Sequence, residues 1–126
     1  MGQAMDRRRL ALVVDDDREQ ADLAAVLLEE ADFEVIEAMS ALEASQILRE
    51  RNGEVALVFT DIWFNRSADG VTLAQEIAAN WPWIKLIVTS GGPVEETKRL
   101  PKSATFVQKP WRALDILVMA DNAGRG

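Results

Sequence analysis

Short apolar runs alternate along the chain with stretches in which apolar residues recur every three or four positions. Five runs are typical of strands buried on both faces of a sheet, namely residues 10–14, 33–36, 55–60, 84–88 and 105–107. The helical periodicity between them predicts four regular helices. The first covers about residues 18–31, and the second runs from Ser40 to the Asn52-Gly53 stop signal. The third ends at Trp81, before Pro82, and the last covers residues 112–120. The pattern therefore predicts strands and helices in regular alternation.

This alternation implies βαβ units with right-handed crossovers, and so an α/β fold with a largely parallel sheet covered by helices on both faces. With 126 residues and no linker or internal repeat, the chain fits one domain over residues 1–126, with its core at about 9–120. In such doubly wound sheets, ligands bind beyond the carboxyl ends of the strands.

Two segments fit the regular pattern less well. Residues 89–106 contain two glycines, two prolines and a polar stretch with almost no apolar stripe, so we expect a fourth helix that is short or irregular. The last helix is apolar on two sides. We expect Leu114, Leu117 and Val118 to form its core stripe, while Ile116, Met119 and Ala120 lie elsewhere. Exposed apolar groups of this kind mark a partner or homodimer surface, and a broadly buried helix is the alternative.

Composition narrows the chemistry. The chain has no cysteine and no histidine, which excludes disulfides, thiolate zinc sites and imidazole bases. Its net charge of −7 argues against nucleic acid as a direct partner, because phosphate contacts need a basic surface. No run approaches the ~20 apolar residues of a membrane span, and the polar start is no signal peptide, so we expect a cytoplasmic protein without a membrane partner.

Chemically useful residues follow four of the apolar runs. The first run ends in Asp15-Asp16-Asp17, the third in Asp61, the fourth in Thr89-Ser90 and the fifth in Lys109-Pro110. Each has an ordinary structural explanation, such as a helix cap or a turn, but their joint occurrence at strand ends favours a site. Carboxylates gathered at one edge need a cation, and Mg²⁺ binds carboxylates together with water and phosphate oxygens. Asp61 could then attack a phosphoryl donor, with Lys109 and Thr89 contacting the phosphoryl oxygens.

The segments VVDDD, the strand end at Asp61 with Asp69-Gly70 downstream, IVTS and FVQKPW closely resemble the receiver domain of two-component response regulators, over about residues 9–120. The resemblance implies a doubly wound, flavodoxin-like five-stranded sheet of strand order 2-1-3-4-5. It also implies a phosphorylation switch rather than an enzyme, fed by a sensor histidine kinase or phosphotransfer protein and acting on a downstream protein partner.

The resemblance assigns a role to each matching position. Asp61 is expected to be the phosphoacceptor, and Asp15, Asp16, Asp61 and the main-chain carbonyl of Trp63 the Mg²⁺ ligands. Thr89 and Phe106 match the family's switch residues, Lys109 its phosphoryl-binding lysine, and Lys109-Pro110 its usual cis peptide bond.

The loop after Asp61 departs from the family pattern. Asn65 stands where members usually have a proline, and the loop is one residue longer than the commonest spacing before Asp-Gly. Trp63 lies two residues after Asp61, and Gly91 lies two residues after Thr89. We expect the indole of Trp63 to exclude water and slow hydrolysis of a phosphoaspartate.

Two other function classes are alternatives to the phosphorylation switch. A pseudo-receiver would use the fold as an interaction module without phosphorylation, and the altered loop is its support. An aspartate-nucleophile phosphatase would need a second aspartate two residues after the nucleophile, where this chain has Trp63. As a switch, the chain could be a stand-alone receiver, a phosphorelay shuttle or part of a hybrid kinase or longer regulator.

Overall fold

A five-stranded parallel sheet forms the centre of the molecule. The computed structural model describes residues 9–92 and 94–125, and its strands are β1 (Arg9–Val14), β2 (Phe33–Ala38), β3 (Val55–Asp61), β4 (Lys85–Ser90) and β5 (Ala104–Gln108). The strand order is β2-β1-β3-β4-β5, and every neighbouring pair is parallel. This confirms the doubly wound sheet and the order 2-1-3-4-5.

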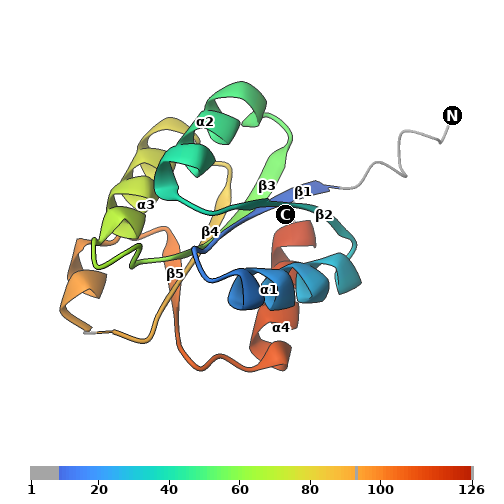
Figure 1. Cartoon of the computed structure of the whole chain (residues 1–126). Helices are drawn as coiled ribbons and strands as arrows, with labels where there is room; N and C mark the ends of the chain where they lie inside the picture. The colour runs from blue at the N-terminus through green and yellow to red at the C-terminus, as the bar shows by residue number, and fades with distance from the viewer. Residues whose placement is uncertain (1–8, 93, 126) are drawn as a thin grey trace, which may run out of the picture.

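Helices cover both faces of the sheet, as Figure 1 shows. The helices α2 (Ala41–Arg51) and α3 (Asp69–Asn80) lie on one face, and α1 (Arg18–Glu30) and α4 (Ala113–Arg125) lie on the other. Between β4 and β5 the chain forms a short 3₁₀ helix, η2 (Val94–Arg99). The prediction of a short or irregular fourth helix is therefore confirmed.

Each face of the sheet has its own hydrophobic core, because successive residues of a strand point to opposite sides. In β1, Leu12 and Val14 pack in the core under α2 and α3, whereas Ala11 and Val13 pack in the core under α1 and α4. All four side chains are fully buried. A strand buried on both faces reads as an unbroken apolar run, which is why the sequence locates the strands so well.

Polar side chains start the first two helices. The carboxylate of Asp17 accepts hydrogen bonds from the backbone N–H groups of Glu19 and Gln20, at 3.0 and 3.4 Å, and so caps α1. The hydroxyl of Ser40 accepts from the N–H of Glu43 at 3.1 Å and caps α2. Because α1 begins directly after Asp17, the two preceding aspartates are held in the short connection at the end of β1.

The buried side of α4 differs from the sequence prediction. Ile116 and Ala120 are fully buried under the sheet, whereas Leu114 is 68% and Val118 is 51% exposed. The predicted core stripe of Leu114, Leu117 and Val118 was therefore wrong. Both sides of the helix are apolar, so periodicity identified two possible faces, and the packing of α4 on β3 and α1 decided between them. The helix also continues to Arg125, past the predicted end at residue 120.

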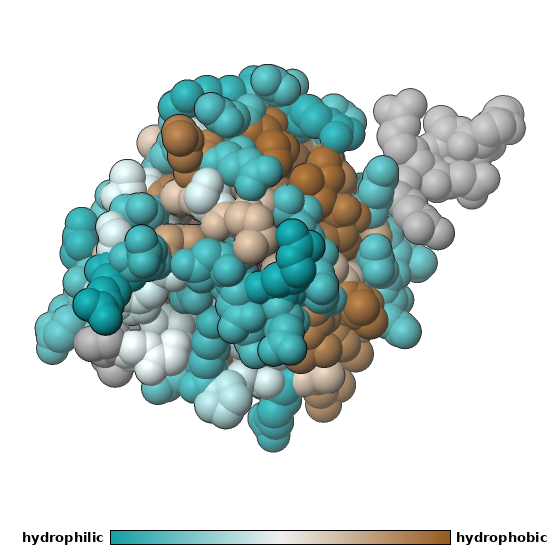
Figure 2. All heavy atoms as spheres, viewed as in Figure 1, coloured by the Kyte–Doolittle hydropathy of each residue, from teal (hydrophilic) through white to brown (hydrophobic). Residues whose placement is uncertain are grey.

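Exposed apolar side chains also lie on α1, where Leu23 is 49% and Val26 is 53% exposed. Figure 2 shows apolar atoms gathered on the side of the molecule where α1 lies. None of the helices in the described ranges is long and apolar enough to cross a membrane.

Candidate functional site

The carboxyl ends of β1, β3, β4 and β5 bring the predicted site residues to one edge of the sheet. Asp61 is the last residue of β3 and stands opposite Thr89 of β4 in the strand register. Asp15 directly follows β1, and its N–H donates to the carbonyl of Ala38 at 3.1 Å. Lys109 follows β5, and its N–H donates to the carbonyl of Ser90 at 3.0 Å. Parallel strands thus place residues that are far apart in sequence at the same level.

Lys109 joins the two buried carboxylates at the centre of the site. Its Nζ lies 3.0 Å from Oδ2 of Asp61 and 3.7 Å from Oδ2 of Asp15. Burial lowers the pKa of Lys109, but the hydrogen bond and negative charge of Asp61, with the charge of Asp15, raise that pKa overall. Lys109 is therefore held in its charged form. The peptide bond between Lys109 and Pro110 is cis.

The surroundings of Asp15 raise the pKa of its carboxyl group. Burial raises the pKa of its carboxyl group, and this outweighs the opposite effects of the Asp17 N–H, which donates to Oδ1 at 2.9 Å, and of Lys109. The neighbouring charges of Asp61 and Asp16 raise the pKa further. A further cation at this edge would relieve the repulsion, so the electrostatics favour a positively charged ligand.

Asp16 is oriented differently from Asp15. Its carboxylate is exposed, and Oδ2 accepts a hydrogen bond from the N–H of Asn65 at 3.2 Å. Asn65 and Arg66, in the loop after β3, have left-handed backbones with φ of 52° and 70°. Asparagine adopts this conformation more readily than most residues do. The unusual loop is thereby tied to the end of β1.

The donor set fits Mg²⁺, although it does not form a complete cage. Over residues 9–92 and 94–125, no group of three or more acidic or histidine side chains is arranged to hold a metal ion. Mg²⁺, however, is usually bound by one or two carboxylates and completes its shell with water and phosphate oxygens. Asp15 and Asp61 can supply those carboxylates, since both converge on Lys109. Ligation by Asp16 and the Trp63 carbonyl stays a prediction.

Thr89 has an unsatisfied hydroxyl group at the level of Asp61 in the sheet. Its side chain is fully buried, and within the described part of the chain its Oγ1 has no hydrogen-bond partner. Its carbonyl is engaged, since it accepts from the N–H of Ile62 at 3.0 Å. A buried, unpaired hydroxyl costs about 1–3 kcal/mol, so it is normally satisfied. This hydroxyl can donate to a new acceptor that arrives at Asp61.

Trp63 lies between Asp61 and the loop after β4. Its backbone N–H donates to Oδ1 of Asp61 at 3.2 Å, and its buried indole Nε1 has no partner among the described residues. The ring lies against Gly92, where an added Cβ would come within 2.7 Å of Nε1. The glycine therefore permits the close approach of the indole, which covers the loop beside the site.

The role of Gly70 was missed by the sequence reasoning, although the Asp69-Gly70 pair was noted. Its N–H donates to the carbonyl of Ile62 at 2.8 Å, and a Cβ at this position would lie 2.0 Å from the carbonyl oxygen of Asp61. Only glycine allows the start of α3 to pack so closely on the end of β3. A glycine in the first turn of a predicted helix was the available signal.

Phe106 occupies β5 opposite Val88 and is half-buried against the core under α2 and α3. It adjoins Val107, which stands opposite Thr89. The structure thus brings Asp15, Asp61, Thr89 and Lys109 to one edge of the sheet. Phe106 lies one residue before the β5 position that pairs with Thr89. The switch role of Phe106 stays a prediction.

Known proteins resemble this chain in both sequence and fold. The family model described as "Response regulator receiver domain" matches residues 11–121. An NtrX-like response regulator from Rickettsia bellii is 27% identical over 89% of this chain and 24% of that protein. The sensor kinase CckA of Brucella abortus is 38% identical over 63% of this chain and 8% of that protein. The chain thus spans about a quarter of the first relative and less than a tenth of the second.

Among solved structures, the receiver domain of NtrX from Brucella abortus is 30% identical, with a TM-score of 0.75, and the match covers 91% of this chain and 98% of that one. The response regulator receiver domain protein from Clostridium thermocellum is 25% identical with a TM-score of 0.79, covering 93% and 94%. The family model spans most of the chain, and the fold agrees with it. The chain belongs to the response regulator receiver domain family of two-component systems.

Proposed function

We propose that this chain is a phosphoacceptor receiver that takes a phosphoryl group on Asp61 from a sensor histidine kinase or phosphotransfer protein. It then signals to a downstream protein through a changed surface, in the cytoplasm and without catalysing a reaction on an external substrate. The observation that carries the proposal is the buried contact of 3.0 Å between Lys109 and Asp61, with an unpaired Thr89 hydroxyl at the same level of the sheet.

The proposed transfer uses a carboxylate oxygen of Asp61 as the nucleophile. This oxygen forms a bond to phosphorus as the phosphorus–nitrogen bond of the donor's phosphohistidine breaks, which gives an acyl phosphate on Asp61. Bound Mg²⁺, with Asp15, Asp16, Asp61 and the Trp63 carbonyl as its protein ligands, would neutralise charge on the phosphoryl oxygens.

The new phosphoryl oxygens then compete for the groups around Asp61. Lys109 can move its hydrogen bond from the carboxylate to the phosphoryl group, and the Thr89 hydroxyl gains the acceptor that it lacks. Both changes favour a different position of the β4 end and the loop after it. Because Thr89 stands opposite Val107 in the register, such a movement is transmitted directly to β5.

A pseudo-receiver is the second candidate. It is favoured by one observation, that the exposed carboxylate of Asp16 is bound to the Asn65 N–H in the lengthened loop and does not converge with the other acids. In that case Asp61 would stay unmodified, and the chain would act as a protein-interaction module.

Phosphorylation from a small donor separates the two candidates. The chain is incubated with acetyl phosphate and Mg²⁺, and intact mass is measured for the parent and for Asp61→Asn. We expect the parent to gain the mass of one phosphoryl group and the variant to gain none. A parent without any mass gain would contradict the switch proposal and favour the pseudo-receiver.

A second measurement uses the tryptophans. Beryllofluoride with Mg²⁺ mimics the phosphoryl group. Its binding should change the fluorescence of Trp63, because the backbone N–H of this residue donates to the carboxylate of Asp61. Chromatography with light scattering on the treated and untreated chain then tests for a phosphorylation-linked homodimer. A dimer that forms equally in the treated and the untreated chain would show that self-association does not depend on phosphorylation.

A further inference from the structure

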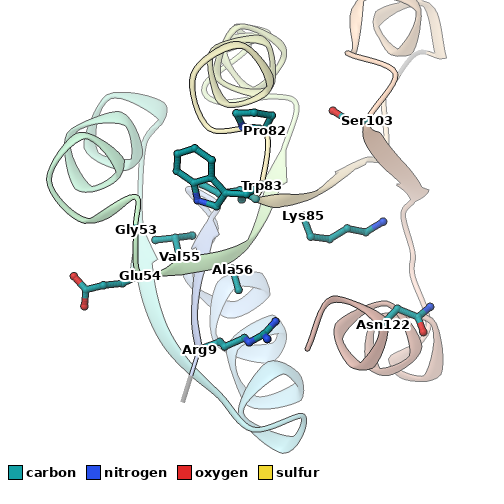
Figure 3. A pocket seen from close by; sticks show the side chains of 11 residues that line it. Arg9, Gly53, Glu54, Val55, Ala56, Pro82, Trp83, Lys85, Ser103 and Asn122 are labelled. Atoms are coloured by element: carbon teal, nitrogen blue, oxygen red, sulfur yellow. The ribbon is translucent and has the colours of Figure 1, made fainter. Parts of the chain in front are cut away.

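A cavity of about 550 Å³ opens at the amino-terminal edge of the sheet, opposite the end that carries Asp61. It lies beneath the starts of β1, β3 and β4 and reaches the C-terminal half of α4. Figure 3 shows Trp83 on one side and Asn122 on the other, with Lys85 extending between them. Its volume falls within the range of about 300–1,000 Å³ that is typical of small-molecule sites.

Trp83 provides a flat apolar wall. Its side chain is 58% exposed, yet its ring is held in place because Nε1 donates a hydrogen bond to the carbonyl of Asn52 at 3.2 Å. Val55 and Pro82 extend the apolar surface beside the indole. An exposed but fixed indole is suited to stacking against a planar ring, because little side-chain entropy is lost on binding.

Lys85 places an uncompensated positive charge in the same cavity. Its Nζ donates to the hydroxyl of Thr105 at 3.2 Å, and it has no ion pair within the described part of the chain. Ser103 and Asn122 add a hydroxyl and an amide to the lining. In a chain of net charge −7, a half-buried cation with no carboxylate partner marks a local preference for an anion.

The remaining charges of the cavity oppose each other. Arg9 and Glu54 both line the cavity and carry opposite charges, so the net charge of the lining is the positive charge of Lys85. The other polar side chains of the lining, Ser103 and Asn122, are neutral and can act as donors, which suits anionic oxygens.

We propose that this cavity binds a small anion with a planar aromatic ring, such as an aromatic carboxylate, sulfonate or phosphate. The ring stacks on Trp83, and the anionic oxygens contact Lys85, with Ser103 and Asn122 as neutral donors. This site is separate from Asp61, because β4 begins at the cavity with Lys85 and reaches the other edge with Thr89.

The probe for this site is 1-anilinonaphthalene-8-sulfonate, an aromatic sulfonate whose fluorescence increases on binding. Its dissociation constant is measured for the parent, Trp83→Ala, Trp83→Phe and Lys85→Met. We expect Trp83→Ala to weaken binding about tenfold and Lys85→Met about threefold, while Trp83→Phe, which keeps an aromatic ring but loses the Nε1 hydrogen bond, falls between the parent and Trp83→Ala. Lys102→Met, which removes an exposed lysine outside the cavity, is the matched control and should have no effect.

A titration followed by ¹⁵N–¹H correlation spectra locates the bound probe, even where a variant folds poorly. Amide shifts should concentrate at Gly53, Ala56 and Ser103. Shifts confined to the exposed apolar side chains of α1 and α4 would overturn the proposal, as would equal binding by the parent and both Trp83→Ala and Lys85→Met. The uncharged analogue N-phenyl-1-naphthylamine should bind about threefold more weakly, and equal affinity would refute the requirement for an anion.

Discussion

Substitution of Gly70 by alanine tests whether the start of α3 fixes the position of Asp61, the proposed phosphoacceptor. The new Cβ would lie 2.0 Å from the carbonyl oxygen of Asp61, 2.6 Å from Cα of Ile62 and 2.8 Å from the Ile62 carbonyl oxygen. These are all backbone atoms, so no side-chain rotation relieves the overlap. Since real Cβ atoms stay at least 3.0 Å from such neighbours, the two segments must separate by about 1 Å.

The separation affects both stability and chemistry. Forced overpacking of this kind costs about 3 kcal/mol, which for a domain of this size corresponds to a fall in Tm of about 10 °C. It also moves Asp61, the proposed nucleophile, and a misplacement of about 1 Å can lower a rate about a hundredfold. We therefore expect Gly70→Ala to lose stability and to be phosphorylated much more slowly by acetyl phosphate.

Gly53→Ala is the matched control for this substitution. No atom lies within 4 Å of a Cβ at Gly53, and its φ is not positive, so alanine should be neutral or stabilise the fold by up to about 1 kcal/mol. Urea unfolding followed by circular dichroism gives both free energies, and intact mass gives the phosphorylation rates. A Gly70→Ala variant with the control's stability and the parent's rate would refute the role assigned to this contact.

Three further substitutions test other parts of the structure. Thr89→Val removes the buried hydroxyl that lacks a partner, so urea unfolding should show a gain of about 1 kcal/mol, while the fluorescence response to beryllofluoride weakens; a loss of stability would show that the hydroxyl is satisfied. Trp63→Ala should speed the decay of phosphorylated Asp61, followed by mass over time, because the indole no longer shields the site from water; decay at or below the parent's rate would contradict this. Ile116→Ala should cost about 3 kcal/mol in thermal unfolding because its side chain is fully buried, whereas Leu114→Ala should stay within about 0.5 kcal/mol; equal losses would contradict the observed orientation of α4.

Much of the fold could be predicted because the chain is consistent at the local level. Strands such as β1 are buried on both faces and read as unbroken apolar runs, and Ser40 marks the start of α2 as expected. The absence of an apolar stripe between β4 and β5 correctly indicated a weak helix, which is η2 in the structure. The residues that follow the strands could be named in advance because parallel strands always present their carboxyl ends at one edge.

The orientation of α4 could not be predicted from the sequence. A helix with apolar residues on two sides leaves the choice of face to the surfaces it packs on, and the structure buries Ile116 rather than Leu114. The close packing of Gly70 on Asp61 and of Trp63 on Gly92 likewise depends on the relative placement of separate segments. The cavity at Trp83 requires the starts of three strands and the end of α4 to meet.

The sequence by itself determined the alternating elements, the parallel sheet and the set of carboxylate, hydroxyl and ammonium groups at its edge. Periodicity and strand-end chemistry are local properties, and they survive in any fold that buries the apolar runs. The tertiary structure decided which of those groups make contact, placing Lys109 on Asp61 at 3.0 Å, leaving the Thr89 hydroxyl unpaired and turning Asp16 toward the loop. The Lys109–Asp61 and Asp16–Asn65 contacts join residues 48 and 49 positions apart, and their geometry depends on strand register and helix packing, which no local pattern records.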